Sequence, residues 1–280
     1  MTLHRPNHPR RAHVLTVLAA IAAVGTIALT QLTPASATQR APQGKTAQKP
    51  TIVLEHGAFA DASSWSAVTR LLQKQGYTVI APANPLEGLP TDTAYLKAVL
   101  KTIKGPVVLV GHSYGGAVIT DASTGDPNVR ALAYIAAYAL AQGESVSQAN
   151  ALCGAKPPLL ASHLVLLPIS KTQIDAYIDP AWFRRVFAAD LPAAQARVMA
   201  AEQRPAALGA LSDPSTAPGW KTIPSWYLVA RNDNAIPPVA EKCMAARAHA
   251  HTIEINSSHV AMLSHPSVVT KLIISAAKAR

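Results

Sequence analysis

Apolar runs alternate with amphipathic stretches from residue 51 to the end of the chain. Short runs rich in Val and Ile predict buried strands, and apolar side chains spaced three and four residues apart predict helices. Strands are expected at 51–55, 77–81, 106–110, 131–136, 225–230 and 251–255. Helices are expected at 63–75, 93–103, 114–123, 238–249 and 267–279. This alternation predicts an α/β fold with a mainly parallel six-stranded sheet flanked by helices.

One long interval interrupts this alternation. Residues 144–222 contain several prolines and no run that predicts a strand. Their helix-like stretches lie at 170–178, 180–188, 192–203 and 205–211. Because the interval falls between the fourth and fifth strands, on the side of their carboxyl ends, it is predicted to form a helical cap over that edge. A helical excursion packed elsewhere is the alternative.

The first 37 residues have the composition of a targeting segment. Three arginines, Arg5, Arg10 and Arg11, precede an apolar run from residue 14 to about 29, and Ala35-Ser36-Ala37 offers a cleavage site. Such a run is short for a membrane span. Residues 1–37 are therefore predicted to be a signal peptide and 38–50 a polar linker before the domain at 51–280. We expect a secreted protein, exported by the general secretory route rather than the twin-arginine route, although an uncleaved anchor stays open.

The positive charge of the chain is concentrated before the domain. The net charge is +10, and residues 1–37 hold three arginines and no acidic residue, so the processed chain carries +7. Three more basic residues precede residue 51, which leaves about +4 for the domain. This charge is dilute, and no basic stripe interleaves with aromatic side chains, so a nucleic-acid partner is not expected.

The cysteines and histidines do not form a metal-binding pattern. Only Cys153 and Cys243 occur, and no Cys/His cluster has the spacing of metal ligands, so neither a metal nor another cofactor is expected. In an exported protein the two cysteines could form a disulfide. Two separately buried thiols are the alternative.

The segment around Ser113 predicts a nucleophile. The apolar run 107–110 leads directly into Gly111-His112-Ser113-Tyr114-Gly115, and a helical pattern follows. This order of strand, sharp turn and helix is typical of a nucleophile elbow, in which small residues allow the backbone to turn and leave the serine hydroxyl exposed. Ser113 is the predicted catalytic nucleophile.

A serine nucleophile needs a base and an acid, which follow in the chain order Ser, Asp or Glu, His. Asp233 follows the predicted strand 225–230, and His259 follows the strand 251–255, so both lie at the carboxyl edge of the sheet. His259 is the predicted base and Asp233 the acid that orients it. Glu144, soon after the fourth strand, is the alternative acid.

The loop after the first strand predicts the remaining part of the site. Oxyanion donors of such enzymes are the amide after the nucleophile and an amide in the loop that follows an early strand. The first strand runs into His56-Gly57-Ala58-Phe59. We therefore assign the oxyanion hole to the amides of Ala58 and Tyr114, with Phe59 as the neighbouring alternative.

These motifs resemble the α/β-hydrolase superfamily. The segments His56–Trp65, Gly111–Gly116 and Ser257–His259 are similar to those of secreted bacterial esterases, which are related in pattern to plant methyl-ester esterases and hydroxynitrile lyases. The resemblance covers residue 51 to the C-terminus and is loose between 144 and 222.

The resemblance implies a serine esterase that acts on a small-molecule ester through Ser113, Asp233 and His259. The lyases carry a threonine at the position of Gly57 and a lysine at that of Val260, so the lyase activity is not expected. A non-catalytic ligand-binding protein and a cofactor-free peroxidase of the same fold are the alternatives.

Overall fold

The computed structural model describes residues 48–279. The predicted signal peptide and most of the predicted linker lie outside the described residues. Within them, no helix is long and apolar enough to cross a membrane.

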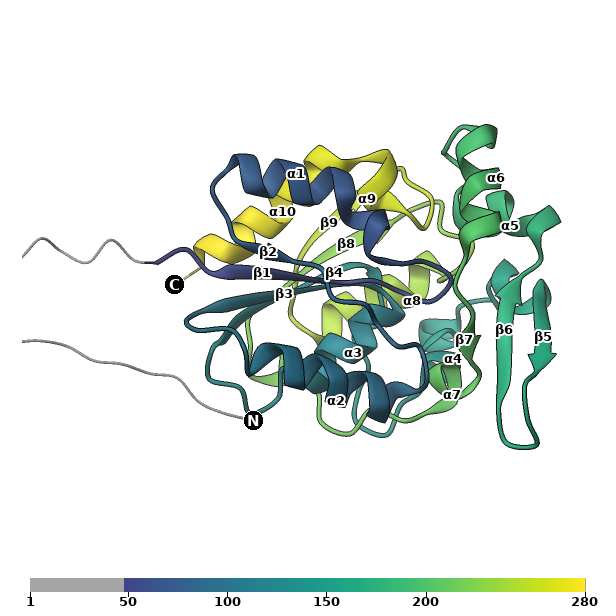
Figure 1. The fold of residues 1–280 in the computed structure, drawn as a ribbon, viewed down its shortest axis with the longest axis horizontal. Helices are drawn as coiled ribbons and strands as arrows, with labels where there is room; N and C mark the ends of the chain where they lie inside the picture. The colour runs from purple at the N-terminus through teal and green to yellow at the C-terminus, as the bar shows by residue number, and fades with distance from the viewer. Residues whose placement is uncertain (1–47, 280) are drawn as a thin grey trace, which may run out of the picture. The chain divides into compact units, whose positions relative to one another are not determined.

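The core of the domain is a six-stranded sheet in which every neighbouring pair is parallel (Figure 1). The strand order is β2-β1-β3-β4-β8-β9. The predicted sheet is therefore confirmed. The strands are β1 (Thr51–Glu55), β2 (Val79–Ile80), β3 (Val107–Ser113), β4 (Val129–Ala137), β8 (Ser225–Ala230) and β9 (His251–Ile255).

Helices cover both faces of this sheet. Figure 1 shows α1 and α10 on one face and α2, α3 and α8 on the other. Every residue of α3 is buried, so the helix that follows Ser113 is held inside the core. The helices outside the insertion are α1 (Ser66–Lys74), α2 (Leu89–Leu100), α3 (Tyr114–Ala122), α8 (Pro238–Arg247), α9 (Ala261–Ser264) and α10 (Pro266–Lys278), with a 3-10 turn η1 (Ala62–Trp65).

The insertion at 144–222 contains a second sheet, so the prediction of a purely helical cap is wrong. Its strands β5 (Leu164–Pro168), β6 (Ile174–Ile178) and β7 (Ala206–Ala207) pair antiparallel. The helix expected over 170–178 is instead a turn followed by β6. Apolar runs of five residues do not distinguish a strand from a helix by periodicity, and the pairing of β5 with β6 decides between them here.

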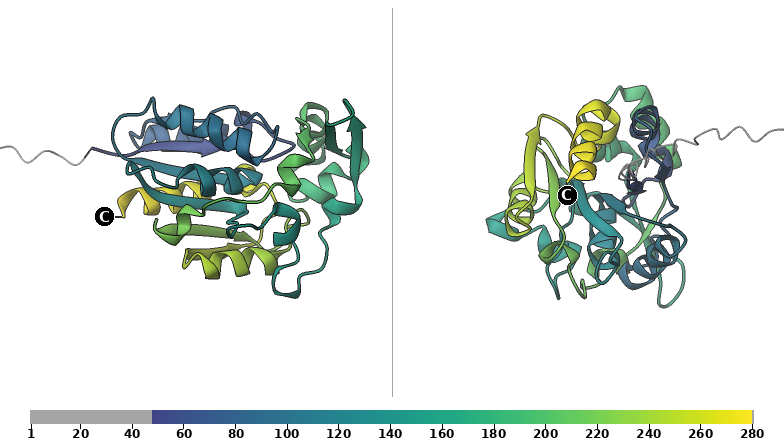
Figure 2. Two further views of the ribbon diagram at one scale, coloured as in Figure 1. Left: turned by 90° about the horizontal axis from the view of Figure 1, so that it is seen from below. Right: turned by 90° about the vertical axis from the view of Figure 1, so that its left-hand side faces the viewer.

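Two of the four predicted helices of the insertion are confirmed, α5 (Pro180–Phe187) and α6 (Ala193–Glu202). The stretch expected at 205–211 holds β7 and the start of a short helix. Figure 2 shows the insertion beyond one end of the main sheet. The remaining elements are α4 (Val146–Ala149), α7 (Gly209–Ser212) and the 3-10 turns η2 (Leu152–Gly154), η3 (Leu159–Ser162) and η4 (Gly219–Lys221).

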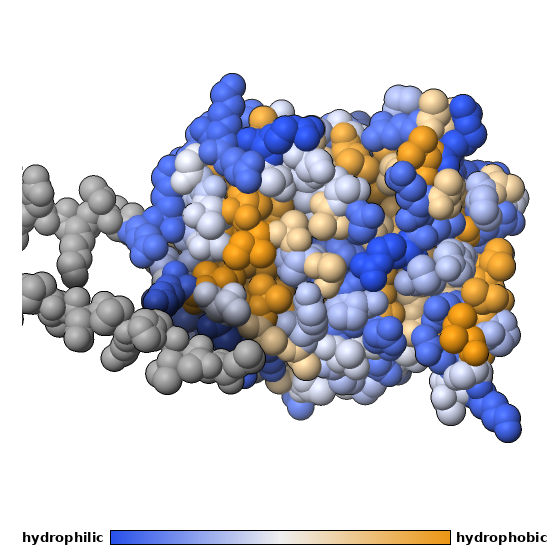
Figure 3. All heavy atoms as spheres, viewed as in Figure 1, coloured by the Kyte–Doolittle hydropathy of each residue, from blue (hydrophilic) through white to orange (hydrophobic). Residues whose placement is uncertain are grey.

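The β5–β6 hairpin exposes large apolar side chains. Figure 3 shows an apolar surface near the end of the hairpin. The exposed residues are Val165, Leu166, Leu167, Ile169 and Ile174.

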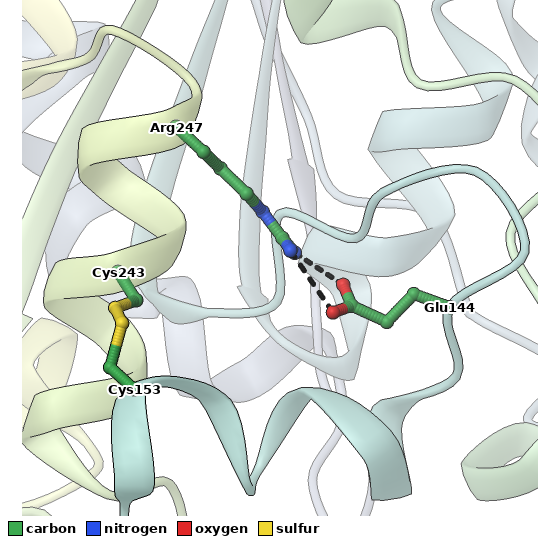
Figure 4. Close-up of a disulfide and its surroundings, with 4 residues drawn as sticks. All are labelled: Glu144, Cys153, Cys243 and Arg247. Carbon is green, nitrogen blue, oxygen red and sulfur yellow. Dashed lines mark hydrogen bonds and ion pairs between the residues drawn. A yellow bond between two sulfur atoms is a disulfide. The ribbon is translucent and has the colours of Figure 1, made fainter.

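A disulfide joins the insertion to the main domain. Cys153 in η2 is bonded to Cys243 in α8, with 6.5 Å between their Cα atoms (Figure 4). The bond connects segments 90 residues apart in the sequence. Because α8 begins shortly after Asp233, the disulfide anchors the start of the insertion beside the loop that carries this acid.

Candidate active site

Ser113 occupies a sharp turn between β3 and α3. Its backbone has φ 53° and ψ −126°, a conformation that residues other than glycine rarely adopt. The turn is possible because its neighbours lack side chains: a Cβ on Gly57 would lie 2.6 Å from that of Ser113, and one on Gly115 would lie 2.6 Å from the carbonyl oxygen of Glu55. The serine is thus held at the point where β3, α3 and the loop after β1 meet.

His259 and Asp233 form a buried pair. Nδ1 of His259 lies 2.6 Å from Oδ2 of Asp233, and both side chains are almost fully buried. The other oxygen, Oδ1, accepts hydrogen bonds from the amides of Ala235 at 2.6 Å and Ile236 at 2.9 Å. An ionised carboxylate can only accept hydrogen bonds. The proton of the neutral imidazole therefore sits on Nδ1, which leaves the lone pair of Nε2 available as a base.

His112, the residue before Ser113, contacts His259 and so places the buried pair close to the nucleophile. The ring of His112 is 4.6 Å from that of His259, centroid to centroid, and its Nε2 lies 3.1 Å from the carbonyl oxygen of His259. Within residues 48–279, Nε2 of His259 has no hydrogen-bond partner, so its bond to Ser113 is not formed in this structure. Catalytic hydrogen bonds often tighten only when substrate binds.

Glu144 is not brought to the site. Its carboxylate accepts a bidentate pair of hydrogen bonds from Arg247 of α8, one of them 3.0 Å long, and another from the amide of Ala141 (Figure 4). The alternative acid is therefore occupied by an ion pair, while Asp233 contacts the histidine directly.

A third histidine, His56, supports the loop after β1. Nε2 of His56 accepts a hydrogen bond from the amide of Asn84 at 3.0 Å, so Nδ1 carries the proton and donates it to the carbonyl oxygen of Gly57 at 2.9 Å. Burial lowers the pKa of His56 to about 4, so this histidine is neutral at physiological pH. The predicted oxyanion donors are the amides of Ala58 and Tyr114. Neither amide has a hydrogen-bond acceptor in the loops and turns of the described residues.

Comparison with known proteins agrees with this fold and arrangement. The model of the alpha/beta hydrolase family matches residues 52–272, most of the chain. The chain belongs to this family. The membership that the motifs around residues 56, 113 and 259 predict is thereby confirmed.

Two curated relatives and one solved structure are among the most similar proteins. Alpha/beta hydrolase nvfD of Aspergillus novofumigatus is 27% identical over 250 residues, which cover 82% of this chain and 97% of that protein. A carbendazim hydrolyzing esterase of a Nocardioides species is 30% identical over 126 residues, 40% of this chain and 51% of the relative. The structure of a pyrethroid hydrolase from Sphingobium faniae superposes with a TM-score of 0.69 at 23% identity, covering 82% of this chain and 98% of that one.

The insertion contributes two residues to the site that the sequence did not point to. Asp190 accepts hydrogen bonds from the amide of Ser258, at 3.0 Å, and from its hydroxyl. Although burial opposes ionisation, these hydrogen bonds hold the pKa of Asp190 below its ordinary value. Phe187 of α5 packs its ring 4.9 Å from that of His259. The insertion therefore holds the segment of His259 by hydrogen bonds from Ser258 to Asp190, and Phe187 covers the His259 ring.

A second set of acids lies behind the nucleophile. The hydroxyl of Tyr114 donates to Asp92 at 2.6 Å, and both side chains are buried. Burial, together with the nearby charge of Asp92, raises the pKa of Glu55 to about 8. The sequence did contain a signal for this group, because Glu55 is a charged residue in an otherwise apolar strand.

Two hollows lie beside the buried site. A cavity of about 220 Å³ adjoins Phe59 of the predicted oxyanion loop and is lined by Met199 and Leu263. A cavity of about 360 Å³ on the insertion side is lined by Tyr138, whose amide donates to the carbonyl oxygen of Ser113 at 3.1 Å, and by apolar side chains such as Leu160. Within residues 48–279 no group of three His, Cys, Asp or Glu side chains could hold a metal ion.

Proposed function

We propose that this protein is a serine esterase that cleaves carboxylic esters through an acyl-enzyme on Ser113. The proposal rests above all on one observation, the buried pair of Asp233 and His259 packed against the residue that precedes a strained elbow serine. Relatives named as an esterase and as hydrolases support it.

Each group has a defined part in the proposed reaction. Nε2 of His259 takes the proton of the Ser113 hydroxyl as its oxygen attacks the ester carbonyl. The amides of Ala58 and Tyr114 stabilise the negative charge that develops on the carbonyl oxygen. The imidazolium, stabilised by Asp233, then protonates the departing alcohol, and a water molecule activated by the same histidine releases the acid.

The surroundings of the site favour small to medium uncharged esters. Phe187 is apolar, and the lining of the larger cavity contains no charged side chain that could pair with a charged acyl group. We propose that the cavity lined by Tyr138, whose amide contacts the carbonyl oxygen of Ser113, receives the acyl group of the ester. We further propose that residues 1–37 direct export of the enzyme and are removed after Ala37.

A fluorophosphonate probe followed by peptide mapping tests the nucleophile. We expect the label on Ser113 and hydrolysis of p-nitrophenyl esters, with Ser113→Ala lowering kcat on the order of 10⁴–10⁶-fold. Folded protein that takes up no label and hydrolyses no ester of two to sixteen acyl carbons would indicate a ligand-binding member of the family. A preference for the longest chains would point to a lipase.

A further inference from the structure

Glu241 is a buried acid that the proposed mechanism does not use. It lies on α8, in the turn that follows the loop of Asp233, and its side chain has no exposure to solvent. One oxygen, Oε2, accepts a hydrogen bond from the amide of Ala230 at the end of β8, 3.2 Å away. The other, Oε1, has no donor among the described residues. An ionised carboxylate with an unpartnered oxygen at full burial is strongly unfavourable.

The unpartnered oxygen is explained by the neighbouring acid. Glu241 and Asp233 meet at Ala230, whose amide donates to Oε2 of Glu241 and whose carbonyl oxygen accepts from the amide of Asp233 at 3.2 Å. Two neighbouring buried carboxyl groups can form a hydrogen bond with each other only when one of them holds a proton. Asp233 already accepts from two amides and from His259, whereas Glu241 accepts from one amide alone. The proton therefore belongs to Glu241, in agreement with burial and the charge of Asp233, which raise its pKa well above the ordinary value.

We infer that Glu241 is a positioning residue that holds a proton on Oε1 and donates it in a hydrogen bond to the carboxylate of Asp233. Its role in catalysis rests on the proposed function, but the hydrogen bond itself does not. This bond is the fourth that Asp233 accepts. It spreads the negative charge of Asp233 and makes that carboxylate a weaker acceptor for His259. The imidazole then releases its extra proton at lower pH, so the base is free over a wider range.

The other ionisable groups around this pair do not replace Glu241. Tyr227 of β8 donates to the carbonyl oxygen of Ala137, and Tyr138 donates to Asn150. Burial raises the pKa of both tyrosines, so they stay neutral. Glu254 of β9 is paired with Lys242 and Arg231 at the surface.

Two substitutions separate the hydrogen bond from the shape of the side chain. Glu241→Gln keeps a donor for Asp233 and an acceptor for Ala230, so we expect kcat/KM within about threefold of the native enzyme and an unchanged acidic limb of the pH profile. Glu241→Met has a similar length and no donor. It should move the midpoint of the acidic limb upward by roughly 1 pH unit. A limb that is the same in both variants would overturn the positioning role.

Two spectroscopic measurements test the proton without activity. Infrared spectra of the native protein in H₂O and D₂O should contain the isotope-sensitive C=O band of a protonated buried carboxyl that Glu241→Gln removes. Glu55→Gln is the matched control, because it should remove a different band. The low-field NMR proton of His259 Nδ1 should shift in Glu241→Met and stay in place in Glu55→Gln.

The outcomes separate the two proposals. If Glu241→Gln removes no such band, Glu241 is ionised and the inference is wrong, whatever the Met variant does. If the band and the NMR shift are observed but Ser113 takes up no fluorophosphonate, the hydrogen bond stands and the esterase proposal fails.

Discussion

The main domain and the insertion differ in whether they bury ionisable side chains. Within residues 48–279, every fully buried ionisable group lies outside 144–222. The polar side chains that the insertion buries are Ser145 and Ser215. The insertion instead exposes most of the large apolar side chains at the surface of the described chain. The buried acidic residues and histidines are Glu55, His56, Asp92, His112, Asp121, Asp233, Glu241 and His259.

This difference separates the two tasks of the molecule. Burying ionisable groups costs free energy unless they are paired or hydrogen-bonded, and such groups gather at functional sites. An apolar insertion can change its lining without disturbing that arrangement. Under the proposed function, the main domain would hold the reacting groups and the insertion would select the ester, and each of the following experiments tests that division.

Among these experiments, the largest effect is expected for Asp233, the predicted acid of the main domain. Asp233→Asn should keep the fold but present His259 with an amide, which favours the wrong imidazole tautomer. In serine proteases, replacing the triad aspartate by asparagine costs about 10⁴-fold in kcat. Steady-state kinetics with a p-nitrophenyl ester measure the loss.

Glu144→Gln is the matched control for this substitution. It removes half of the ion pair with Arg247 and should lower thermal stability with little change in kcat. Should the two variants show the reverse, the acid after β4 would be the functional one and the geometry around Asp233 would have a structural role.

The main domain could be predicted from the sequence because each of its signals is local. Apolar runs buried on both faces mark β1, β3, β4 and β8, and the glycines beside Ser113 mark a turn that only small residues permit. The positions of Asp233 and His259 follow from the topology, since the carboxyl ends of parallel strands meet at one edge. His259 and Asp233 are therefore paired in the structure as the sequence indicated.

The insertion could not be predicted in the same way because long-range contacts decide its structure. Leu164–Pro168 is an apolar run that becomes a strand only by pairing with 174–178. Asp190 shows no motif, and its contact with Ser258 joins residues 68 positions apart. The disulfide was open for a related reason, because the distance between Cys153 and Cys243 depends on how the insertion folds back onto α8.

Asp190 is the residue of the insertion that contacts the segment of His259, so it tests whether the insertion also affects the reacting groups. Asp190→Ala removes both hydrogen bonds to Ser258 and frees the segment that carries His259. Because small displacements of a catalytic group have large effects, we expect kcat to fall about 10–100-fold with KM nearly unchanged. The same kinetic assay, with circular dichroism to verify folding, provides the measurement.

Asp179→Ala is the control within the insertion. Asp179 caps α5 by accepting from the amide of Ala181 at 2.9 Å, so its loss should affect stability and leave kcat alone. If Asp190→Ala also lowers stability and leaves kcat unchanged, the insertion does not position the base. The insertion would then affect only the selection of the ester.

The third prediction concerns selection of the ester. Leu160→Trp should fill part of the 360 Å³ cavity beside Tyr138. We expect kcat/KM for an octanoyl ester to fall about tenfold relative to an acetyl ester, since such pockets discriminate by this order per methylene. Leu166→Ala changes an exposed side chain of the hairpin and should leave the ratio of the two esters unchanged. Equal ratios in all three proteins would place the acyl group elsewhere, and the cavity at Phe59 would be the next to test.

The smallest change in turnover is expected for Glu55→Gln, which tests the electrostatic cost carried by the main domain. Burial raises the pKa of Glu55 from 4.5 to about 8, so between these values the unfolded chain releases a proton that the native protein keeps. The native state binds more protons there, and stability must fall as the pH rises through this window.

The shift corresponds to roughly 3–5 kcal/mol. Urea unfolding at pH 5, 7 and 8.5 should therefore show the Gln variant gaining stability over the native protein as the pH increases. Glu87→Gln, at an exposed position, should follow the native curve. If Glu55→Gln also runs parallel to the native protein across this range, Glu55 is ionised in the folded state. Solvation or pairing would then stabilise the charge of the buried acids beside Ser113. The main domain would bury these groups without the loss of folding free energy that sets it apart from the insertion.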